Sequence, residues 1–467
     1  MPDQNFSGPL ERFTEYAMAG ESDDYPKTDW TQLQFRGPID YSAISEAYDQ
    51  AMSDVPIFSC NLREARNGLI YQPTWVFNKD VKNRLIIEDC RHMAGDPFDP
   101  MDFSTRFHAH RTSRRINPVR EFPLRCFLVR VTDDEHIFSI LYHHSVMEPA
   151  KTVRMLTNML AVYHKLVKGK EPEWKDKQGL GIMNRKTAMT TPISLPSFFK
   201  EQVTDIFFKN RASTMSGIAT RRVLPPAKCK GRISLRHVWD DPKIPEALLK
   251  RALKNESSLN DLILAGARKA IAKWNREHDA KSDKLRFMLI TSLRGRMPAT
   301  DETGIMLAGL NYLADCQSTD IDEQTRHFRD MRKDQLKRGI DIGYHNILSV
   351  VVRMLRLLPL KTRLSLVRPI IERMMITFYL SNLGTMWPKM VDGRQTLDST
   401  VLGAGDFEIS DIHSSASLTT AVQLGLTTRA HNRRFYFNFV CDRFRFEQDE
   451  AKELTDLIVR ELENAAG

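Results

Sequence analysis

The sequence predicts a mixed α+β fold made of two αβ halves, and three features of the chain support this prediction. Two β-rich runs, 124–131 and 136–143, are joined by four polar residues and followed by an amphipathic helix. The residues from 170 to 230 then carry scattered Lys, Pro and Thr without a clear period. A second series of helices and strands begins near Gly231 and ends with a cleanly alternating run at 433–442.

The length of the chain and its composition agree with this organisation. The 467 residues suffice for roughly two or three domains, and a hydrophobic content of 42% supports a large core. We expect a first half at residues 1–175, a crossover at 176–230 and a second half at 231–467. We see no internal repeat and no low-complexity tract in the sequence.

The first half contains two further predicted elements, and the ends of the helix after the β-rich runs can also be predicted. Residues 30–35 (WTQLQF) alternate and predict a strand. Residues 40–54 predict a helix whose apolar face contains Ile44, Ala47, Tyr48 and Ala51. A second helix begins at Pro149, since proline suits a first turn where no backbone N–H is needed, and it ends before Gly169. Its apolar stripe consists of Val153, Leu156, Leu160, Tyr163 and Val167.

The second half shows the same kinds of signal. The pair Ser258 and Asp261 predicts a capped helix start for the segment 257–274. The residues 284–293 predict a buried strand, and an amphipathic helix at about 448–463 closes the chain.

Composition also limits the classes of function. The sequence has no apolar run of the ~18 residues that a membrane-spanning helix needs. Its acidic N-terminus resembles neither a secretory signal nor a transit peptide. The six cysteines are scattered without a CxxC pair, which indicates free thiols in a reducing cytoplasm rather than a zinc site or a disulfide framework.

The charge balance is modestly basic. Lys and Arg total 68 against 59 Asp and Glu, a net charge of +9. This excess is compatible with an acidic partner or with ordinary solubilising charge. We find no nucleic-acid-binding signature, so no nucleic-acid partner is expected. The segment 347–378 interleaves six cations with long apolar residues, which suits either a helix on an anionic membrane surface or a helical pair packed on the core with its arginines in solvent.

The residues that could carry chemistry lie in the segment 141–149, LYHHSVMEP. A histidine at the end of an apolar strand is a candidate general base, because its ordinary pKa lies near neutral pH. The alternative is that His143 and His144 only pack at a strand end. A metal site is not expected, since adjacent strand residues point to opposite faces and no third ligand is suitably spaced.

Four segments together resemble the chloramphenicol-acetyltransferase-like acyltransferases, which include the condensation domains of nonribosomal peptide synthetases, wax-ester synthases and polyketide-associated acyltransferases. The segments are 54–64, 123–166 with the His-His motif, 258–296 with the Asn260-Asp261 helix, and 376–386 with Ser-Asn-x-Gly. They occur in the order typical of that family and span most of the chain.

The resemblance implies two chloramphenicol-acetyltransferase-like halves in a V-shaped pseudo-dimer with a central tunnel. It implies that His144 is the catalytic base and that His143 is its structural neighbour. The donor would be an acyl thioester of coenzyme A or of a carrier protein, and the acceptor a hydroxyl, an amine or a lipid, without a bound cofactor or metal. The protein would be free-standing and cytoplasmic, with peripheral membrane contact through 347–378 as a further expectation.

The family motif His-His-x-x-x-Asp-Gly ends here in Glu148-Pro149. The aspartate of the family is a structural residue that pairs with an arginine, so Glu148 is expected to support the motif. The early-segment arginine corresponds to Ser59 here, and Arg63 and Arg125 are the alternative partners.

The tetrahedral intermediate of acyl transfer needs a hydrogen-bond donor for its oxyanion. Asn311, Ser381 and Asn382 are the candidates, and the alternative for each is ordinary turn chemistry. Arg294 either orders the tunnel wall or forms a surface ion pair.

The sequence therefore predicts a free-standing acyltransferase. The second hypothesis is a catalytically silent protein of the same fold that binds a carrier protein or a lipid, and the Glu148-Pro149 departure favours it.

Overall fold

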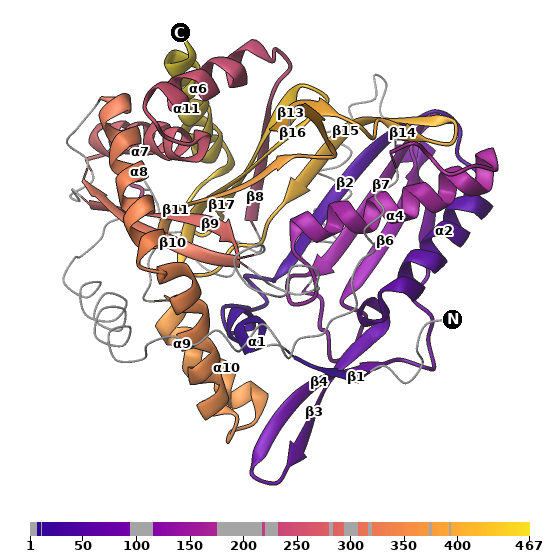
Figure 1. Ribbon diagram of the computed structural model, residues 1–467. Coiled ribbons are helices and arrows are strands. Elements are labelled where there is room, and N and C mark those ends of the chain that lie inside the picture. Colours follow the sequence, from indigo (N-terminus) through magenta and orange to yellow (C-terminus); the bar gives the residue numbers. More distant parts are fainter. Residues whose placement is uncertain are drawn as a thin grey trace.

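The computed structural model describes residues 7–10, 12–93, 115–174, 217–219, 232–279, 284–293, 307–315, 320–372, 376–391 and 394–467. Two mixed six-stranded sheets dominate these residues, and Figure 1 shows them side by side, each with helices packed on one face. The two sheets and their helices form the predicted α+β architecture.

The elements of the first half run in the following order. They are β1 (Ser7–Pro9), α1 (Arg12–Met18), β2 (Thr28–Arg36), α2 (Tyr41–Asp54), the 3₁₀ turn η1 (Pro56–Ser59), β3 (Cys60–Asn67), β4 (Ile70–Phe77), β5 (Ile86–Asp89), the 3₁₀ turn η2 (Arg91–Met93), β6 (Leu124–Arg130), β7 (Glu135–His143) and α4 (Pro149–Lys168). Helices α2 and α4 pack on one face of the first sheet and bury its main core. The predicted strand at 30–35, the helix at 40–54 and the hairpin before the histidines are confirmed.

The predicted ends of α4 are also confirmed. Pro149 occupies the first turn, and Gly169 at the C-cap has a left-handed φ of 71°, a conformation that glycine adopts without steric cost.

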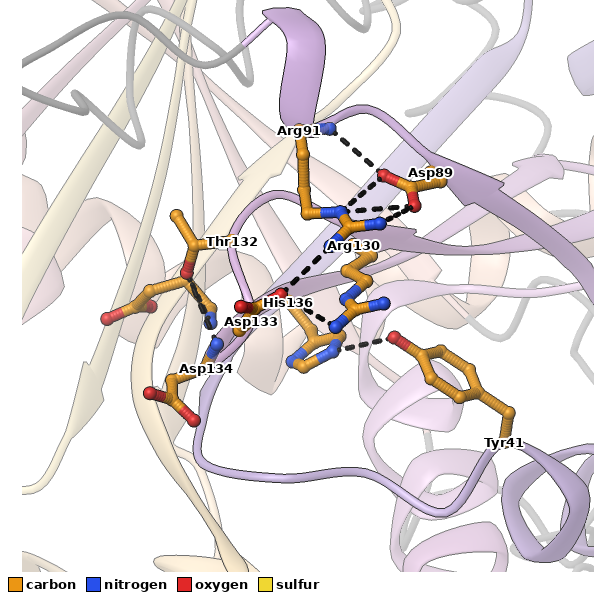
Figure 2. A network of polar contacts seen from close by, with 9 residues as sticks. Tyr41, Asp89, Arg91, Arg130, Thr132, Asp133, Asp134 and His136 are labelled. Carbon is orange, nitrogen blue, oxygen red and sulfur yellow. Dashed lines mark hydrogen bonds and ion pairs between the residues drawn. The ribbon is translucent and has the colours of Figure 1, made fainter.

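Figure 2 shows the turn of the β6–β7 hairpin, which lies at the end of β7 opposite His143. The Thr132 hydroxyl accepts hydrogen bonds from the N–H groups of Asp134 (3.3 Å) and Glu135 (2.9 Å). Arg91 and Arg130 both donate to the Asp133 carboxylate, at 3.0 and 2.7 Å. These bonds hold the turn that joins β6 to β7.

The elements of the second half are β8 (Arg232–Trp239), α6 (Lys243–Lys254), α7 (Leu259–Glu277), β9 (Lys284–Ser292), β10 (Leu307–Asp315), α8 (Ile321–Lys337), α9 (Ile340–Leu355), α10 (Leu360–Glu372), β11 (Ile376–Thr385), β12 (Pro388–Val391), β13 (Arg394–Ser399), β14 (Gly403–Ala404), β15 (Phe407–Ser415), β16 (Val422–His431), β17 (Arg434–Asp442) and α11 (Gln448–Ala466). Helices α6, α7 and α11 bury the core of the second sheet, whose strand order is β10-β9-β11-β16-β17-β8.

The predicted elements of the second half are confirmed in type. Helix α7 begins with the capping box between Ser258 and Asp261. Strand β17 places Phe435, Phe437, Phe439 and Cys441 in the core, as its alternation predicts. The crossover at 176–230 lies outside the described residues apart from 217–219.

One strand pair departs from a simple division of the chain into halves. The first sheet has the order β14-β15-β2-β7-β6-β5, so two strands from late in the sequence extend the sheet of the first half. Strand β15 pairs with β2 in antiparallel register, with Ile412 opposite Leu33. The boundaries at 175 and 231 stay a prediction, and the sheets do not follow them strictly.

The basic segment 347–378 differs from the expectation that its arginines all lie in solvent, whereas its contact with a membrane stays a prediction. It contains the end of α9, all of α10 and the start of β11. Arg356 and Arg363 are not in solvent: both are buried, and their guanidinium groups contact the buried Glu15 carboxylate of α1 at 3.0 and 2.7 Å. The sequence could not show this because Glu15 lies far away along the chain.

Cysteines 60, 90, 126 and 441 are buried thiols, whereas residues 229 and 316 lie outside the described residues. Among the helices of the described ranges, none has the length and apolar character required to cross a membrane.

Candidate functional site

The histidine pair lies at the C-terminal end of β7, where backbone hydrogen bonds from both sides fix it. The His143 N–H donates to the Pro123 carbonyl at 2.7 Å, and the His144 N–H donates to the Lys27 carbonyl at 2.8 Å. Lys27 immediately precedes β2, and Thr28 is the register partner of His143. The start of β2 is therefore placed directly beside the pair.

The two imidazoles have different surroundings. His143 is fully buried, with Nδ1 2.6 Å from the Ser145 hydroxyl and Nε2 3.3 Å from Glu21 Oε1. The His144 side chain keeps 22% of its surface exposed, and its Nδ1 lies 2.9 Å from Asp29 Oδ2. Of the two, only His144 combines solvent access with a carboxylate neighbour, which supports its prediction as the reactive histidine.

Asp29 is a buried carboxylate at the start of β2. Its Oδ1 accepts a hydrogen bond of 2.5 Å from the Ser417 N–H. Burial alone would raise the pKa of Asp29, but His144, the Arg232 guanidinium and the Ser417 N–H together hold this pKa below its ordinary value. Asp29 is therefore ionised at neutral pH, with one oxygen facing His144.

This contact determines the tautomer of His144. A carboxylate accepts hydrogen bonds and cannot donate one, so Nδ1 must carry the hydrogen when the ring is neutral. The lone pair then resides on Nε2. A neutral His144 of this kind has a proton acceptor on the nitrogen that does not face Asp29.

Cationic groups surround the carboxylates behind the histidines. Lys27 is almost completely buried, and burial lowers the pKa of its ammonium to about 8 in spite of the opposing charges of Asp29 and Glu21. Arg232 of β8 donates to the Thr28 carbonyl at 2.9 Å. These cations offset the negative charge of Asp29 and Glu21 inside the protein.

Glu21 supports the inner histidine. One of its oxygens accepts a hydrogen bond from the Lys27 N–H at 3.2 Å, and the other lies 2.9 Å from the Arg115 guanidinium. Burial opposes ionisation, but His143 and Arg115 outweigh it and lower the pKa of Glu21 to about 2. These contacts hold His143 in place. His144, which directly follows β7, is thereby positioned at the site.

The second half contributes Arg232, Ser417 and Tyr379 to this region. The charge of Asp29 adds to burial in raising the pKa of Tyr379, whereas Arg232 lowers it, so the phenol lies within electrostatic reach of both groups. Gly425 makes room for this ring, because a Cβ at this position would lie 2.3 Å from two ring carbons of Tyr379. The site therefore forms where the two halves meet.

Glu148 has the position of a helix cap. It is the N-cap residue of α4, has extended backbone angles and is almost fully buried. Of its predicted partners, Arg125 forms an ion pair with Glu121, and Arg63 is exposed on β3. Ser59 is buried in η1. The supporting role of Glu148 stays a prediction.

The candidate oxyanion donors do not lie on one surface. Ser381 is on the same face of β11 as Tyr379, because alternate strand residues share a face. Asn382 points to the other face, where it donates to Asn260 Oδ1 at 2.7 Å and accepts from the Gly384 N–H at 2.9 Å. Ser381 is therefore the better placed of these two.

The remaining candidates lie further from the histidines. Asn311 is on the edge strand β10, which β9 separates from β11, and its backbone carbonyl accepts a hydrogen bond from Gln335. Arg294 lies outside the described residues. Within the described ranges, no group of three His, Cys, Asp or Glu residues could hold a metal ion.

Sequence reasoning missed Asp29, Glu21, Lys27 and Arg232. Each is an ordinary charged residue at the start of a strand or in a turn, and no motif marks it. The alternating pattern at 30–35 predicts the strand but not the register that places Asp29 beside Tyr142 and next to His144.

Comparisons with known proteins identify the fold. Neither a protein-family model nor a curated protein sequence matches this chain. Among solved structures, the epimerization domain from the third module of tyrocidine synthetase B has a TM-score of 0.65 at 14% identity, over 99% of this chain and 98% of that domain. The starter condensation domain of rhizomide synthetase has a TM-score of 0.69 at 12% identity, over 98% of this chain and 94% of that one. The protein has the condensation-domain fold.

The condensation fold extends across both halves. Polyketide synthase associated protein 5 from Mycobacterium tuberculosis also matches, with a TM-score of 0.62 at 12% identity and 99% coverage of both chains. The predicted fold class, two chloramphenicol-acetyltransferase-like halves in a pseudo-dimer, is thus confirmed. In this condensation fold, β7 and the start of β2 supply the histidines and Asp29, and β8 and β11 supply Arg232 and Tyr379.

Proposed function

We propose that this protein is an acyltransferase that moves an acyl group from a thioester to a hydroxyl or amine, with His144 as general base. The observation that carries the proposal is the 2.9 Å contact between His144 Nδ1 and the ionised Asp29, which leaves Nε2 as a proton acceptor. The 22% exposure of the His144 side chain supports access for a substrate.

The proposed reaction has two steps. In the first, His144 Nε2 takes the proton of the acceptor while the acceptor oxygen or nitrogen forms a bond to the thioester carbonyl carbon. The resulting oxyanion needs a hydrogen-bond donor, and Ser381 is the candidate on the face of β11 that also carries Tyr379. In the second, the carbon–sulfur bond breaks, the carbonyl reforms and the departing sulfur takes the proton from Nε2.

Asp29 remains ionised throughout these steps. The imidazolium that forms after the first step is stabilised by the adjacent carboxylate, as its charge is partly buried. No step requires a metal or a bound cofactor.

The thioester is proposed to be an acyl-coenzyme A or an acylated carrier protein. The rhizomide synthetase domain is described in complex with C8-CoA and Leu-SNAC, and the first condensation domain of the calcium-dependent antibiotic synthetase in complex with substrate analogues. The net charge of +9 suits donors that carry phosphate or carboxylate groups.

The second candidate function is a catalytically silent protein that binds a carrier protein or lipid through the same fold. Glu148 and Pro149 favour this second function. Pro149 restricts the backbone at the start of α4. The side chain of Glu148 is one methylene longer than the aspartate that the family motif has at this position.

The proposal is tested by mass spectrometry. The full chain is incubated with candidate acceptors and with a panel of acyl-coenzyme A and acyl-carrier thioesters. With a substrate that is turned over, His144→Ala should lower the transfer rate roughly 10²- to 10⁴-fold, the usual contribution of a positioned base. The matched control is His327→Ala, which removes an exposed histidine of α8 and should leave the rate unchanged. An unchanged rate in His144→Ala would refute the role of this histidine. Binding of a carrier without any transfer would support the silent protein instead.

A further inference from the structure

One end of the molecule exposes large apolar side chains. We call it the hairpin–helix tip and define it as residues 63–71, at the turn of the β3–β4 hairpin, and residues 353–361, at the corner between α9 and α10. Leu69 is 72% exposed, Ile70 48%, Met354 69% and Leu357 61%. Exposed apolar side chains gathered on one surface mark sites that contact another protein or a membrane.

The two parts of the hairpin–helix tip form one structure. The Tyr71 N–H donates to the Arg356 carbonyl at 2.7 Å, and the Leu360 N–H donates to the Glu64 carboxylate at 2.8 Å. Figure 1 shows the β3–β4 hairpin projecting beyond the two sheets, with α10 beside it. The exposed leucines of the hairpin and of the helix corner therefore belong to the same projecting end.

Buried ion pairs hold this end in place. Arg356 and Arg363 both contact Glu15, and Arg363 also lies 3.1 Å from Glu64. The Arg363 guanidinium additionally donates to the Leu358 carbonyl at 2.6 Å. The apolar residues are thus displayed on a fixed scaffold, which lowers the entropic cost of binding.

The charged residues of the hairpin–helix tip are mostly basic. Arg63, Arg66, Arg353 and Lys361 are exposed. Glu64 is the single acidic residue of the two ranges, and Arg363 and the Leu360 N–H already engage its carboxylate. Any partner of this surface therefore meets apolar side chains surrounded by cations.

We propose that the hairpin–helix tip binds the surface of an anionic lipid bilayer. Leucine and methionine at a projecting turn can enter the boundary between head groups and acyl chains, while the longer arginine and lysine side chains reach the phosphates. An acidic protein is the other class of partner with complementary charge. The lipid surface fits better because Leu69 is on a hairpin turn that a flat deformable layer can surround on all sides.

The inference does not depend on acyl transfer, and its test measures binding alone. The full chain is sedimented with vesicles of phosphatidylcholine, and with vesicles of phosphatidylcholine and phosphatidylserine in equal amounts. We expect the protein to pellet with the anionic vesicles only and to be released by salt, which screens the attraction. The double variant Arg66→Glu with Lys361→Glu should weaken this binding by at least about 25-fold, because each lost cation contributes about fivefold to the affinity for an anionic membrane.

A second variant tests the apolar contribution. Leu69→Ser with Leu357→Ser keeps every charge and should also weaken vesicle binding. The matched control is Lys250→Glu with Lys254→Glu on α6, a helix that likewise exposes two lysines beside exposed Leu249 and Leu253. Circular dichroism shows whether each variant is folded.

The inference would be overturned if the wild type did not bind anionic vesicles, or if it bound neutral vesicles equally well. It would also be overturned if the α6 control lost as much vesicle binding as the tip variants, or if both tip variants bound anionic vesicles as well as the wild type. Capture of an acidic carrier protein by the wild type but not by the Arg66→Glu with Lys361→Glu variant, without vesicle binding, would assign the surface to a protein partner instead.

Discussion

At the scale of single residues, the chemistry of the site depends on which carboxylate each histidine faces. His143 and His144 are adjacent in sequence, yet one is enclosed with Glu21 and the other is partly exposed beside Asp29. The motif alone predicts a reactive histidine. The orientation of that histidine comes from Asp29, a residue of another strand.

The first prediction concerns Asp29 as a positioning residue. Asp29→Asn keeps the shape of the side chain and removes the charge, so its amide can donate to Nδ1 and favour the wrong tautomer. We expect the transfer rate to fall roughly 10²- to 10⁴-fold, because the base is then presented with its lone pair on Nδ1. Nitrogen-15 NMR of the His144 ring should show hydrogen on Nδ1 in the wild type and on Nε2 in the variant.

The control for this prediction is Asp241→Asn, a change of the same kind at an exposed position before α6. A loss of rate in Asp29→Asn with an unchanged His144 tautomer would mean that Asp29 acts only through stability.

His144 and Asp29 show which residues of the site could be predicted from the sequence and which could not. His144 was predictable because its neighbours form a recognisable motif. Asp29 was not, because the β2–β7 register brings it to the site, and a shift of one residue would turn its side chain to the other face of the sheet. A single sequence does not specify that register.

At the scale of elements, α1 and the turn after it connect helices α9 and α10 to the histidines. Glu15 of α1 contacts Arg356 and Arg363, and Glu21 in the turn contacts His143. Arg368 of α10 donates to the Glu21 carbonyl. Amphipathic elements such as α4 and α7 could be predicted from their period, but this polar linkage has no period and could not.

The second prediction concerns the pH dependence of stability at Glu21. Its pKa is about 2 in the folded protein and about 4.5 in an unfolded chain, so the carboxylate binds protons less readily when folded. The stabilisation is fully present above pH 4.5 and is lost as the pH falls from 4.5 towards 2. A difference of this size corresponds to about 3 kcal/mol.

We therefore expect Glu21→Gln to lower the free energy of unfolding in urea at pH 6 by about 3 kcal/mol, and by much less near pH 3. Glu277→Gln, at an exposed site of α7, should change the free energy of unfolding little at either pH. A difference between Glu21→Gln and wild type that stays constant across this range would contradict the prediction.

At the scale of the whole molecule, β15 connects the two halves. It pairs with β2 of the first sheet, and its Asp411 and Ser415 contact Arg236 and Ser234 of β8 in the second sheet. Tyr25, which precedes β2, donates to Asp442 at the end of β17. The composition and the four family-like segments predicted two halves, but not that one of them donates a strand to the other, because nothing in the pattern of 407–415 specifies its partner sheet.

The last prediction follows from this donated strand. Ile412 of β15 is buried in the core of the first half, although the chain reaches it through the second. Ile412→Ala should therefore lower the free energy of unfolding by about 2–5 kcal/mol, the usual cost of such a cavity. Because β15 contacts both sheets, amides of β7 and of β17 should lose hydrogen-exchange protection together. Leu402→Ala, at a partly exposed neighbouring leucine, should cost much less. Loss of protection in β7 alone would mean that the halves unfold independently and that β15 belongs energetically only to the first.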